Sequence, residues 1–334
     1  EKDINEYLNK SRIKEVVEKI LFEDGLNYGY LPKGLLKFHN YLEGARTAVE
    51  EHLIESIQYA KGKNGVKLHF TIPIEHEQKF KSLFAELQKK HEKNDLKINI
   101  TYSFQKKSTD TIAVDLNNNP LIDKEGKFVF RPGGHGALLE NLNDLNTDLI
   151  FIKNIDNISP DHLKSITIKY KKALAGLLIR IKKQIEDFLT YLEWHDAYTD
   201  KRKHEIAEFI ELYLGIKVRS IEDNSIYAGY IKSILDKPIR ICGMVKNTGE
   251  PGGGPFWVYN KKGELSLQII ESSQVDLMDS QQRDIFYSAT HFNPVDIVCC
   301  TKDYAKNKYN LLKYRDNSTG FITEKSYEGE KIKV

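Results

Sequence analysis

The sequence predicts an α/β protein with a mostly parallel mixed sheet flanked by helices and a helical insertion. Three observations support this prediction. Apolar spacing alternates between helical and strand periods up to about residue 158, a long helical stretch follows, and short strands separated by turns fill the last hundred residues. With 334 residues, 40% of them hydrophobic, the chain can bury a large core.

Residues 1–25 predict a helical lead-in, and residues 26–158 predict an α/β half. Each helix in this half has apolar residues three or four positions apart, and each strand alternates or is wholly apolar. The expected elements are a helix around Val49 and Leu53, a strand at 66–72, a helix at 75–91, a strand at 97–104, a short helix at 137–143 and a strand at 148–155. Alternation of this kind is typical of parallel strands joined by helices.

The second half of the chain changes its pattern twice. Residues 159–235 are mostly helical, with lysines and arginines mainly opposite a leucine and isoleucine stripe, which indicates a helical insertion or crossover with a solvated outer face. Residues 236–334 predict a second half of mixed strands. Cys242, Cys299 and Cys300 fall in such strands, and we expect them to be buried thiols.

Composition excludes several classes of function. Lys and Arg total 50 against 48 Asp and Glu, and these charges are interspersed, so no nucleic-acid partner is expected. The sequence has no apolar run of membrane-spanning length and no signal-peptide pattern, which predicts a cytoplasmic protein without a membrane partner. Because the sequence begins with Glu, we expect it to be a fragment. It leaves the oligomeric state open.

Two stretches combine residues suited to a nucleotide site. "RPGGHG" places glycines where a loop enters a helix, so backbone N–H groups could approach a base or phosphate. "DLIFIKNIDN" ends an apolar strand at Asp156, whose carboxylate could hold Mg²⁺ together with nucleotide phosphates. Both stretches are equally compatible with ordinary turns, because glycine, asparagine and aspartate are common turn residues.

Further segments could hold phosphate and sugar groups. "YLPKGLLKFHN" presents Lys33 between Pro32 and Gly34, and a lysine ammonium is suited to phosphate. "EPGGG" forms a second glycine-rich turn, and Glu271 and Asn293 fall at or near strand ends.

The order of these segments resembles that of the UDP-sugar pyrophosphorylases, which have the nucleotide-diphospho-sugar transferase fold. Over residues 31–306, "LPKGL", "FQ", "PGGHG", "FIKNIDN", "EPGG", "QIIESSQ" and "HFNPVDIV" are similar to successive family motifs. The run from "STDTIAV" to "FIKNIDN" also resembles a domain-of-unknown-function family common in Bacteroidetes.

The resemblance implies a nucleotidyltransferase that uses Mg²⁺, a nucleoside triphosphate with UTP favoured, and a sugar phosphate. Lys33 and Asp156 would be catalytic, with Asp156 on the metal. The other implied residues are Gln105, Gly133, Gly134, His135, Gly136 and Asn154 for the nucleotide, and Gly252, Glu271 and Asn293 for the sugar. Catalysis would come from positioning and charge neutralisation. The resemblance also makes residues 26–158 the nucleotide-binding half and residues 236–334 the sugar-binding half.

One departure from the family keeps a second hypothesis open. The sequence before Lys33 lacks the Gly-x-Gly-Thr-Arg type of loop that holds the triphosphate in the family. The alternative is therefore a catalytically incomplete nucleotide or nucleotide-sugar binding module.

Hydrolases are weaker alternatives. The spacing of His52, His69, His76 and His91 suggests no metal-ligand pair, so we expect core or surface histidines. The absence of a Gly-x-Ser-x-Gly motif disfavours a Ser-His-Asp hydrolase.

Overall fold

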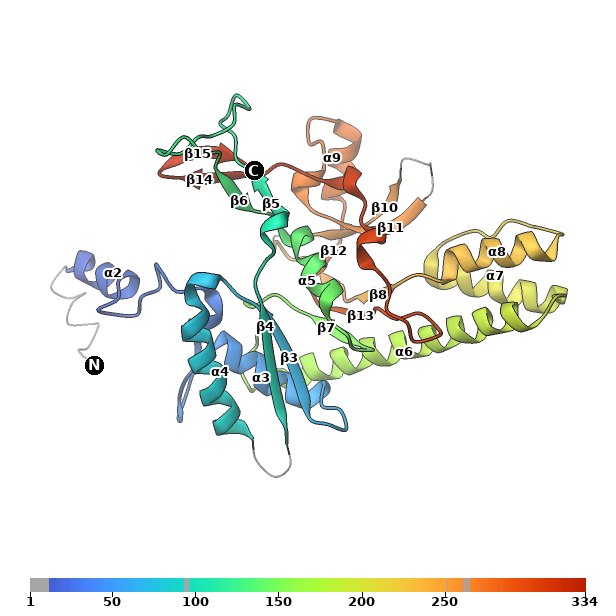
Figure 1. Cartoon of the computed structure of the whole chain (residues 1–334), viewed down its shortest axis with the longest axis horizontal. Helices are drawn as coiled ribbons and strands as arrows, with labels where there is room; N and C mark the ends of the chain where they lie inside the picture. Colours follow the sequence, from blue (N-terminus) through green and yellow to red (C-terminus); the bar gives the residue numbers. More distant parts are fainter. Residues whose placement is uncertain (1–11, 93–95, 251, 261–262, 264) are drawn as a thin grey trace. The chain divides into compact units, whose positions relative to one another are not determined.

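The computed structural model describes residues 12–92, 96–250, 252–260, 263 and 265–334. The chain divides into two compact units (Figure 1). The first unit comprises Glu1–Gln105 and Asn154–Tyr170, and the second comprises Lys106–Lys153 and Lys171–Val334.

The first unit is built around two parallel strands and two helices. Its elements are α2 (Ile13–Leu21), the 3₁₀ turn η1 (Lys33–Leu35), the hairpin β1 (Lys37–Tyr41) and β2 (Gly44–Thr47), α3 (Ala48–Tyr59), β3 (Val66–Thr71), the turn η2 (Ile74–His76), α4 (Glu77–His91) and β4 (Ile98–Ser103). Strands β3 and β4 pair in parallel, with Val66 opposite Ile98, and α4 connects them. Thr47 begins α3, because its side chain accepts a hydrogen bond from the Glu50 N–H.

The core of the first unit lies between these helices and one face of the β3–β4 pair. Its buried residues come from both helices and both strands, and aromatic rings of α4 stack against the strands. The buried set is Val49, Leu53, Val66, Ile72, Phe80, Phe84, Leu87 and Ile98. Alternation along the strands leaves the other face polar, with His69, Thr101 and Ser103 on it.

The second unit contains three helices, two further short helical segments and several small sheets. The helices are α6 (Lys164–Trp194, from Lys171 onward in this unit), α7 (Asp200–Leu214) and α8 (Asn224–Leu235), which pack side by side around Phe188, Ile206, Ile210 and Ile231 (Figure 1). The shorter helices are α5 (Leu139–Asp144) and α9 (Ser280–Tyr287), and the 3₁₀ turns are η3 (Lys107–Thr109), η4 (His135–Leu138), η5 (Ser272–Gln274), η6 (Leu311–Tyr314) and η7 (Asn317–Thr319).

Strands far apart in the sequence form the central sheet of the second unit. β7 (Ile150–Ile152) and β8 (Ile239–Cys242) flank β13 (Ile297–Cys300), and both pairings are antiparallel. The remaining pairs are β5 (Asp110–Ile112) with β6 (Phe130–Pro132), β9 (Val245–Lys246) with β12 (His291–Phe292), β10 (Gly254–Tyr259) with β11 (Leu265–Ile270), and β14 (Glu324–Tyr327) with β15 (Glu330–Lys333).

The predicted mostly parallel mixed sheet of the nucleotide-diphospho-sugar transferase type is wrong. The described residues form seven separate sheets of two or three strands, and among them only β3 and β4 pair in parallel. Apolar alternation indicates that a segment is extended, but it does not specify the partner strand or its direction. The strand at Ile150–Ile152, expected in a mostly parallel sheet, instead pairs antiparallel with β13, almost 150 residues later.

Most individual elements are where the sequence predicts them. The helices α3, α4, α6 and α7 and the strands β3, β4 and β7 are confirmed, and β8, β10, β11 and β13 agree with the short strands expected in residues 236–334. The glycine loop differs, because it enters η4 and α5 begins only at Leu139. Cys299 and Cys300 are buried in β13 as expected, and Cys242 is half-buried in β8.

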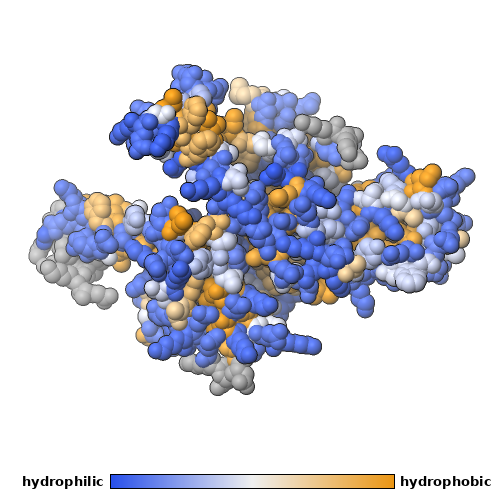
Figure 2. All heavy atoms as spheres, in the orientation of Figure 1, coloured by the Kyte–Doolittle hydropathy of each residue, from blue (hydrophilic) through white to orange (hydrophobic). Residues whose placement is uncertain are grey.

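The described part of the chain exposes a mixed surface. Hydrophilic residues cover most of the face shown in Figure 2, and apolar residues form separate patches on it. No described helix combines the length and apolar character that crossing a membrane requires.

Candidate functional site

Lys33 and Asp156 meet in the first unit, although 123 residues separate them in the sequence. The Lys33 Nζ lies 2.5 Å from the Asp156 Oδ2. The side chains are 62% and 36% exposed, respectively, so both groups are accessible to a ligand. The structure therefore pairs the residues that the family resemblance assigns to phosphate and metal.

Local packing fixes both sides of this pair. Gly34 is buried under α4, where an added Cβ would lie 3.0 Å from Phe80, so glycine lets η1 pack closely against the core. On the other side, the His52 Nε2 of α3 lies 3.0 Å from the Ile155 carbonyl oxygen. These contacts hold the backbone that carries Lys33 against α4 and the backbone that carries Asp156 against α3, two helices that share one core.

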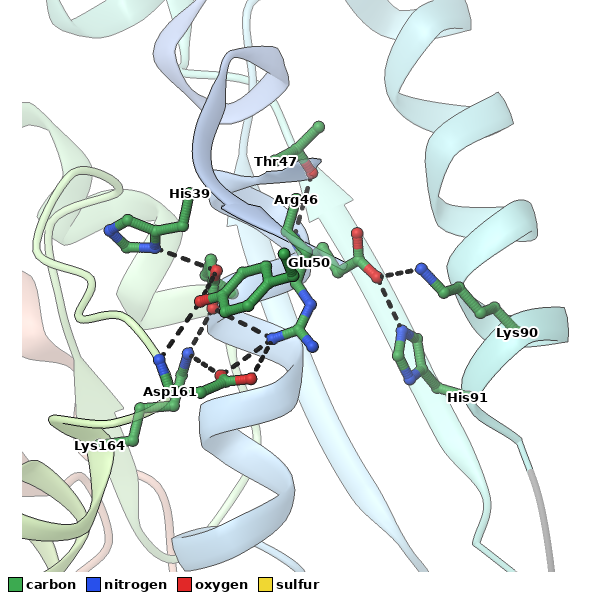
Figure 3. Close-up of polar contacts among 10 residues, drawn as sticks. His39, Arg46, Thr47, Glu50, Lys90, His91, Asp161 and Lys164 are labelled. Carbon is green, nitrogen blue, oxygen red and sulfur yellow. Dashed lines mark hydrogen bonds and ion pairs between the residues drawn. The ribbon is translucent and has the colours of Figure 1, made fainter. Parts of the chain in front are cut away.

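A buried charge network surrounds the beginning of α3 (Figure 3). Glu51 is fully buried and accepts a hydrogen bond from the Tyr41 hydroxyl at 2.7 Å and an ion-pair contact from the Lys164 ammonium. The His39 Nδ1 lies 3.0 Å from the same carboxylate. Asp161 completes the network, since Lys164 donates to it at 2.8 Å and Arg46 Nη1 donates to both of its oxygens. We call these six residues the Glu51 network.

Charge pairing dominates the protonation states in the Glu51 network. Burial disfavours the charged forms of Asp161, Lys164 and Arg46, but their mutual hydrogen bonds outweigh it, so the pKa of Asp161 is lowered and the pKa values of Lys164 and Arg46 are raised. Burial, reinforced by the Glu51 carboxylate, raises the pKa of the Tyr41 hydroxyl. The network therefore keeps two cations and the Asp161 carboxylate charged at neutral pH.

The neighbouring Glu50 forms a separate contact on the other side of α3 (Figure 3). Its Oε1 accepts a hydrogen bond from Lys90 at 2.8 Å and lies 3.0 Å from the His91 Nε2, both near the end of α4. Burial favours the neutral acid, but the bonds with His91 and Lys90 prevail and lower the pKa of Glu50. This contact joins the first turn of α3 to the last turn of α4.

The glycine loop 133–136 lies in the second unit and is mostly exposed. Gly134 has an ordinary φ of −69°, and a Cβ added to Gly134 or Gly136 would meet no atom within 4 Å. Neither the backbone conformation nor packing within the described residues therefore requires glycine at these two positions. Open space beside a backbone is what a site for a closely approaching ligand would need.

The three residues predicted for the sugar are gathered in the second unit. A Cβ on Gly252 would lie 3.8 Å from the Asn293 carbonyl oxygen, and one on the adjacent Gly253 would lie 3.4 Å from the Glu271 Cγ. Unlike Gly134, these glycines are required by packing, since the added atoms would also approach Phe292 to 2.9 Å and Ile269 to 2.5 Å.

The polar groups of two of these residues have partners within the chain. The buried Asn293 donates from its Nδ2 to the Gly243 oxygen at 2.7 Å and accepts from the Val295 N–H at 3.0 Å. Glu271 forms a capping box with Gln274 at the start of η5. Both side chains therefore position their own loops.

The predicted residues thus fall into both units. The first unit holds Lys33, Gln105, Asn154 and Asp156, and the second holds the glycine loop with His135 and the Gly252, Glu271 and Asn293 group. Within the first unit, Asn154 begins the turn that carries Asp156, because its carbonyl oxygen accepts from the Asn157 N–H.

Sequence reasoning missed the Glu51 network. "AVEEHLIES" resembles a solvated helix face, and the partners of Glu51 are about ten residues before it and more than a hundred after it. The sequence gives one indication of the network, the two adjacent acidic residues Glu50 and Glu51 in the first turn of the helix. Acidic residues at this position are also explained by their favourable interaction with the helix dipole.

The Asp156 carboxylate has the chemistry of a Mg²⁺ ligand, and a metal held there would need further oxygen atoms from water or from a ligand. The described residues contain no cluster of three His, Cys, Asp or Glu side chains able to hold a metal by themselves. Mg²⁺ commonly uses one or two carboxylates and completes its shell with water and substrate phosphates. Asp156 can supply the carboxylate, and Lys33 lies where a phosphate could contact it.

Comparison with known protein families identifies the family of this chain. The family described as "Domain of unknown function (DUF4301)" matches residues 1–334. The chain belongs to this family. This DUF4301 chain matched neither a curated protein nor a solved structure.

Proposed function

We propose that this DUF4301 chain binds a nucleoside triphosphate with Mg²⁺ at Lys33 and Asp156. The reaction that we propose is transfer of the nucleotidyl group to a sugar 1-phosphate, as in the UDP-sugar pyrophosphorylases. The 2.5 Å contact between Lys33 and Asp156 carries the proposal, because the family resemblance assigns these two residues to phosphate and metal and the fold brings them together.

The chemistry requires positioning and charge, not a protein nucleophile. A sugar phosphate oxygen attacks the α-phosphorus in line, and the bond to the β,γ-pyrophosphate breaks. Mg²⁺, when bound, neutralises phosphate charge. Lys33 would contact a phosphate oxygen of the bound nucleotide in place of Asp156, and Asp156 would be the residue that holds the metal. The exposure of both side chains permits this exchange.

The space beside Gly134 and Gly136 supports a role for the glycine loop in nucleotide binding. A flat base can approach a backbone only where no side chain intervenes. This observation is independent of the Lys33–Asp156 contact, since the two features belong to different units.

A nucleotide-binding module without turnover is the second candidate. The binding module is favoured by the conformation of Gly25 and Gly29, which precede Lys33 and pack or hydrogen-bond within the chain. A Cβ on Gly25 would lie 1.8 Å from the Lys19 carbonyl oxygen, and the Gly29 N–H donates to the Leu21 oxygen. Within the described residues these glycines close the end of α2, where a triphosphate-binding loop would need open N–H groups.

Calorimetric titration with UTP, with and without Mg²⁺, tests the proposed function. Asp156→Asn should remove the gain in affinity that Mg²⁺ provides. Lys33→Gln should weaken UTP binding about 10-fold or more, which corresponds to the loss of one charged hydrogen bond, while a Mg²⁺ effect remains. Lys37→Gln is the matched control, because Lys37 is another exposed lysine close by in β1.

Two results would contradict the proposal. One is UTP binding that neither substitution alters, and the other is no detectable UTP binding by the unaltered chain. Release of pyrophosphate from UTP and a sugar 1-phosphate separates the transferase from the binding module, since the module binds without turnover.

A further inference from the structure

A histidine links two hydroxyl side chains on the polar face of the β3–β4 pair. The His69 Nδ1 lies 2.9 Å from the Thr101 Oγ1, and the His69 Nε2 lies 2.9 Å from the Ser103 Oγ. The parallel register explains this arrangement, because His69 is opposite Thr101 and Ser103 follows two residues later on the same face of β4. All three residues belong to the first unit.

The contact made by Thr101 favours one tautomer of His69. The Thr101 hydroxyl is placed to donate to the Leu68 carbonyl oxygen at 3.2 Å. When it does so, its oxygen accepts from the Nδ1–H of the neutral imidazole. In that tautomer the lone pair of Nε2 faces the Ser103 Oγ at 2.9 Å, where it can accept the serine O–H.

The surroundings of His69 keep its ring neutral at neutral pH. Burial of the half-buried ring lowers its pKa below the ordinary value of 6.5. The exposed Lys67 is the charged residue on the same face of β3, and the same face of β4 carries Asn99, Thr101 and Ser103. A neutral imidazole with a free-base nitrogen directed at a hydroxyl is the arrangement that general-base activation requires.

The position of Ser103 also suits chemistry. It is the last residue of β4, at the carboxyl end of a parallel pair, where α/β structures place their ligands. A nucleophilic serine is recognised by its hydrogen-bond partners, because the same serine and histidine geometry occurs on unrelated backbones. The absence of a Gly-x-Ser-x-Gly turn therefore excludes one backbone arrangement and not the chemistry.

We propose that Ser103 is a nucleophilic serine, that His69 is its general base, and that this face of the first unit cleaves carboxylic esters. The Ser103 Oγ attacks the ester carbonyl carbon while its proton moves to the His69 Nε2. The bond to the alcohol oxygen breaks, and that oxygen takes the proton from His69. Water then hydrolyses the acyl-serine by the same proton transfers, which releases the carboxylic acid and restores Ser103.

Thr101 is a positioning residue in this proposal. It holds the Nδ1–H of His69 and so fixes the tautomer, the role that a hydrogen-bonded carboxylate fills in other serine sites. Neither Lys33 nor Asp156 takes part, so the ester-cleavage proposal and the nucleotide-binding proposal can fail independently.

The test is acylation of the full chain by p-nitrophenyl acetate, followed by p-nitrophenol release and by peptide mapping of the acetyl group. We expect acetylation of Ser103 that Ser103→Ala abolishes. His69→Gln keeps a polar side chain but removes the base, and it should slow acylation about 100-fold or more. Thr71→Val is the matched control, because Thr71 is a hydroxyl residue on the same face.

The pH profile adds an independent measurement. Acylation should rise with pH as His69 loses its proton, with its midpoint below 6.5. Thr101→Val should shift this midpoint and slow acylation, and Thr101→Ser should restore both. The proposal fails if no acetyl group reaches Ser103 in the folded chain, or if His69→Gln leaves the rate of Ser103 acylation unchanged. Either result would mean that the three side chains only stabilise the strand pair.

Discussion

Buried charges in the first unit act as pairs whose members come from distant parts of the sequence. Glu51 and Lys164 are both almost fully buried, so each would be costly without the other. Lys171 in the second unit behaves similarly, because it is 1% exposed and pairs with Asp296. It is an exception to the expected solvation of the lysines in this helical stretch.

At this scale we predict that Glu51→Gln destabilises the first unit by about 3 kcal/mol, since it removes the fully buried carboxylate that pairs with Lys164 and leaves Asp161 as the remaining counter-charge of that lysine. Urea denaturation would measure the loss. Adding Lys164→Met should recover part of it, so the double-mutant cycle should show strong coupling between the two positions. Additive losses in the cycle would contradict the assignment.

The ends and interiors of helices use glycine for different reasons. Gly215 ends α7 with a φ of 66°, and its N–H donates to the Glu211 carbonyl oxygen. This left-handed conformation favours glycine. Packing adds a second requirement, because a Cβ at Gly215 would lie 2.2 Å from the Trp257 ring. Gly176, in the interior of α6, meets neither requirement, since a Cβ there would contact nothing within 4 Å.

These two glycines provide a matched prediction within the second unit. Gly215→Ala should lower the free energy of unfolding by about 1 kcal/mol or more, because alanine opposes the positive φ and contacts Trp257. Gly176→Ala should raise it by about 0.5–1 kcal/mol, because alanine restricts the unfolded chain and favours the helix. Chemical denaturation of the two variants would check both signs. Equal effects of the two substitutions would refute this account of Gly215.

At the scale of the whole molecule, stability should depend on acidic groups whose pKa values are lowered by folding. The bonds made by Glu50 and Asp161 hold their folded pKa values below the ordinary 4.5 and 3.8. Each carboxylate therefore stabilises the folded chain fully above its ordinary pKa, and this contribution is lost as the pH falls through the lower folded value.

We accordingly expect the melting temperature to be steady in mildly acidic buffer and to fall as the pH drops below about 4.5. Glu50→Gln should lower the melting temperature at neutral pH and make the acidic decline shallower, because one group that takes up a proton on unfolding has been removed. Thermal unfolding followed by circular dichroism at a series of pH values would measure both effects. An acidic decline as steep in the variant as in the unaltered chain would contradict the role of Glu50.

The sequence by itself determined which segments are helical and which are extended. Periodicity depends on which side of a segment is buried, so the patterns around Val49, Phe84 and Ile100 predicted α3, α4 and β4 correctly. The sequence also indicated Lys33 and Asp156 as candidate site residues, through short motifs that occur in the same order as in the UDP-sugar pyrophosphorylases.

Only the tertiary structure decided how strands pair and which polar side chains meet. The apolar side chains of Ile150–Ile152 would be buried equally well beside β4 or beside β13, because apolar contacts have no direction. In the folded chain this strand pairs antiparallel with β13. The sequence around Glu51 does not distinguish it from an exposed helix residue. Its burial becomes apparent only in the fold, where Lys164 contacts it. His69 becomes a possible base only when the parallel register brings Ser103 to it, since hydrogen bonds depend on distance and direction that the order of residues does not contain.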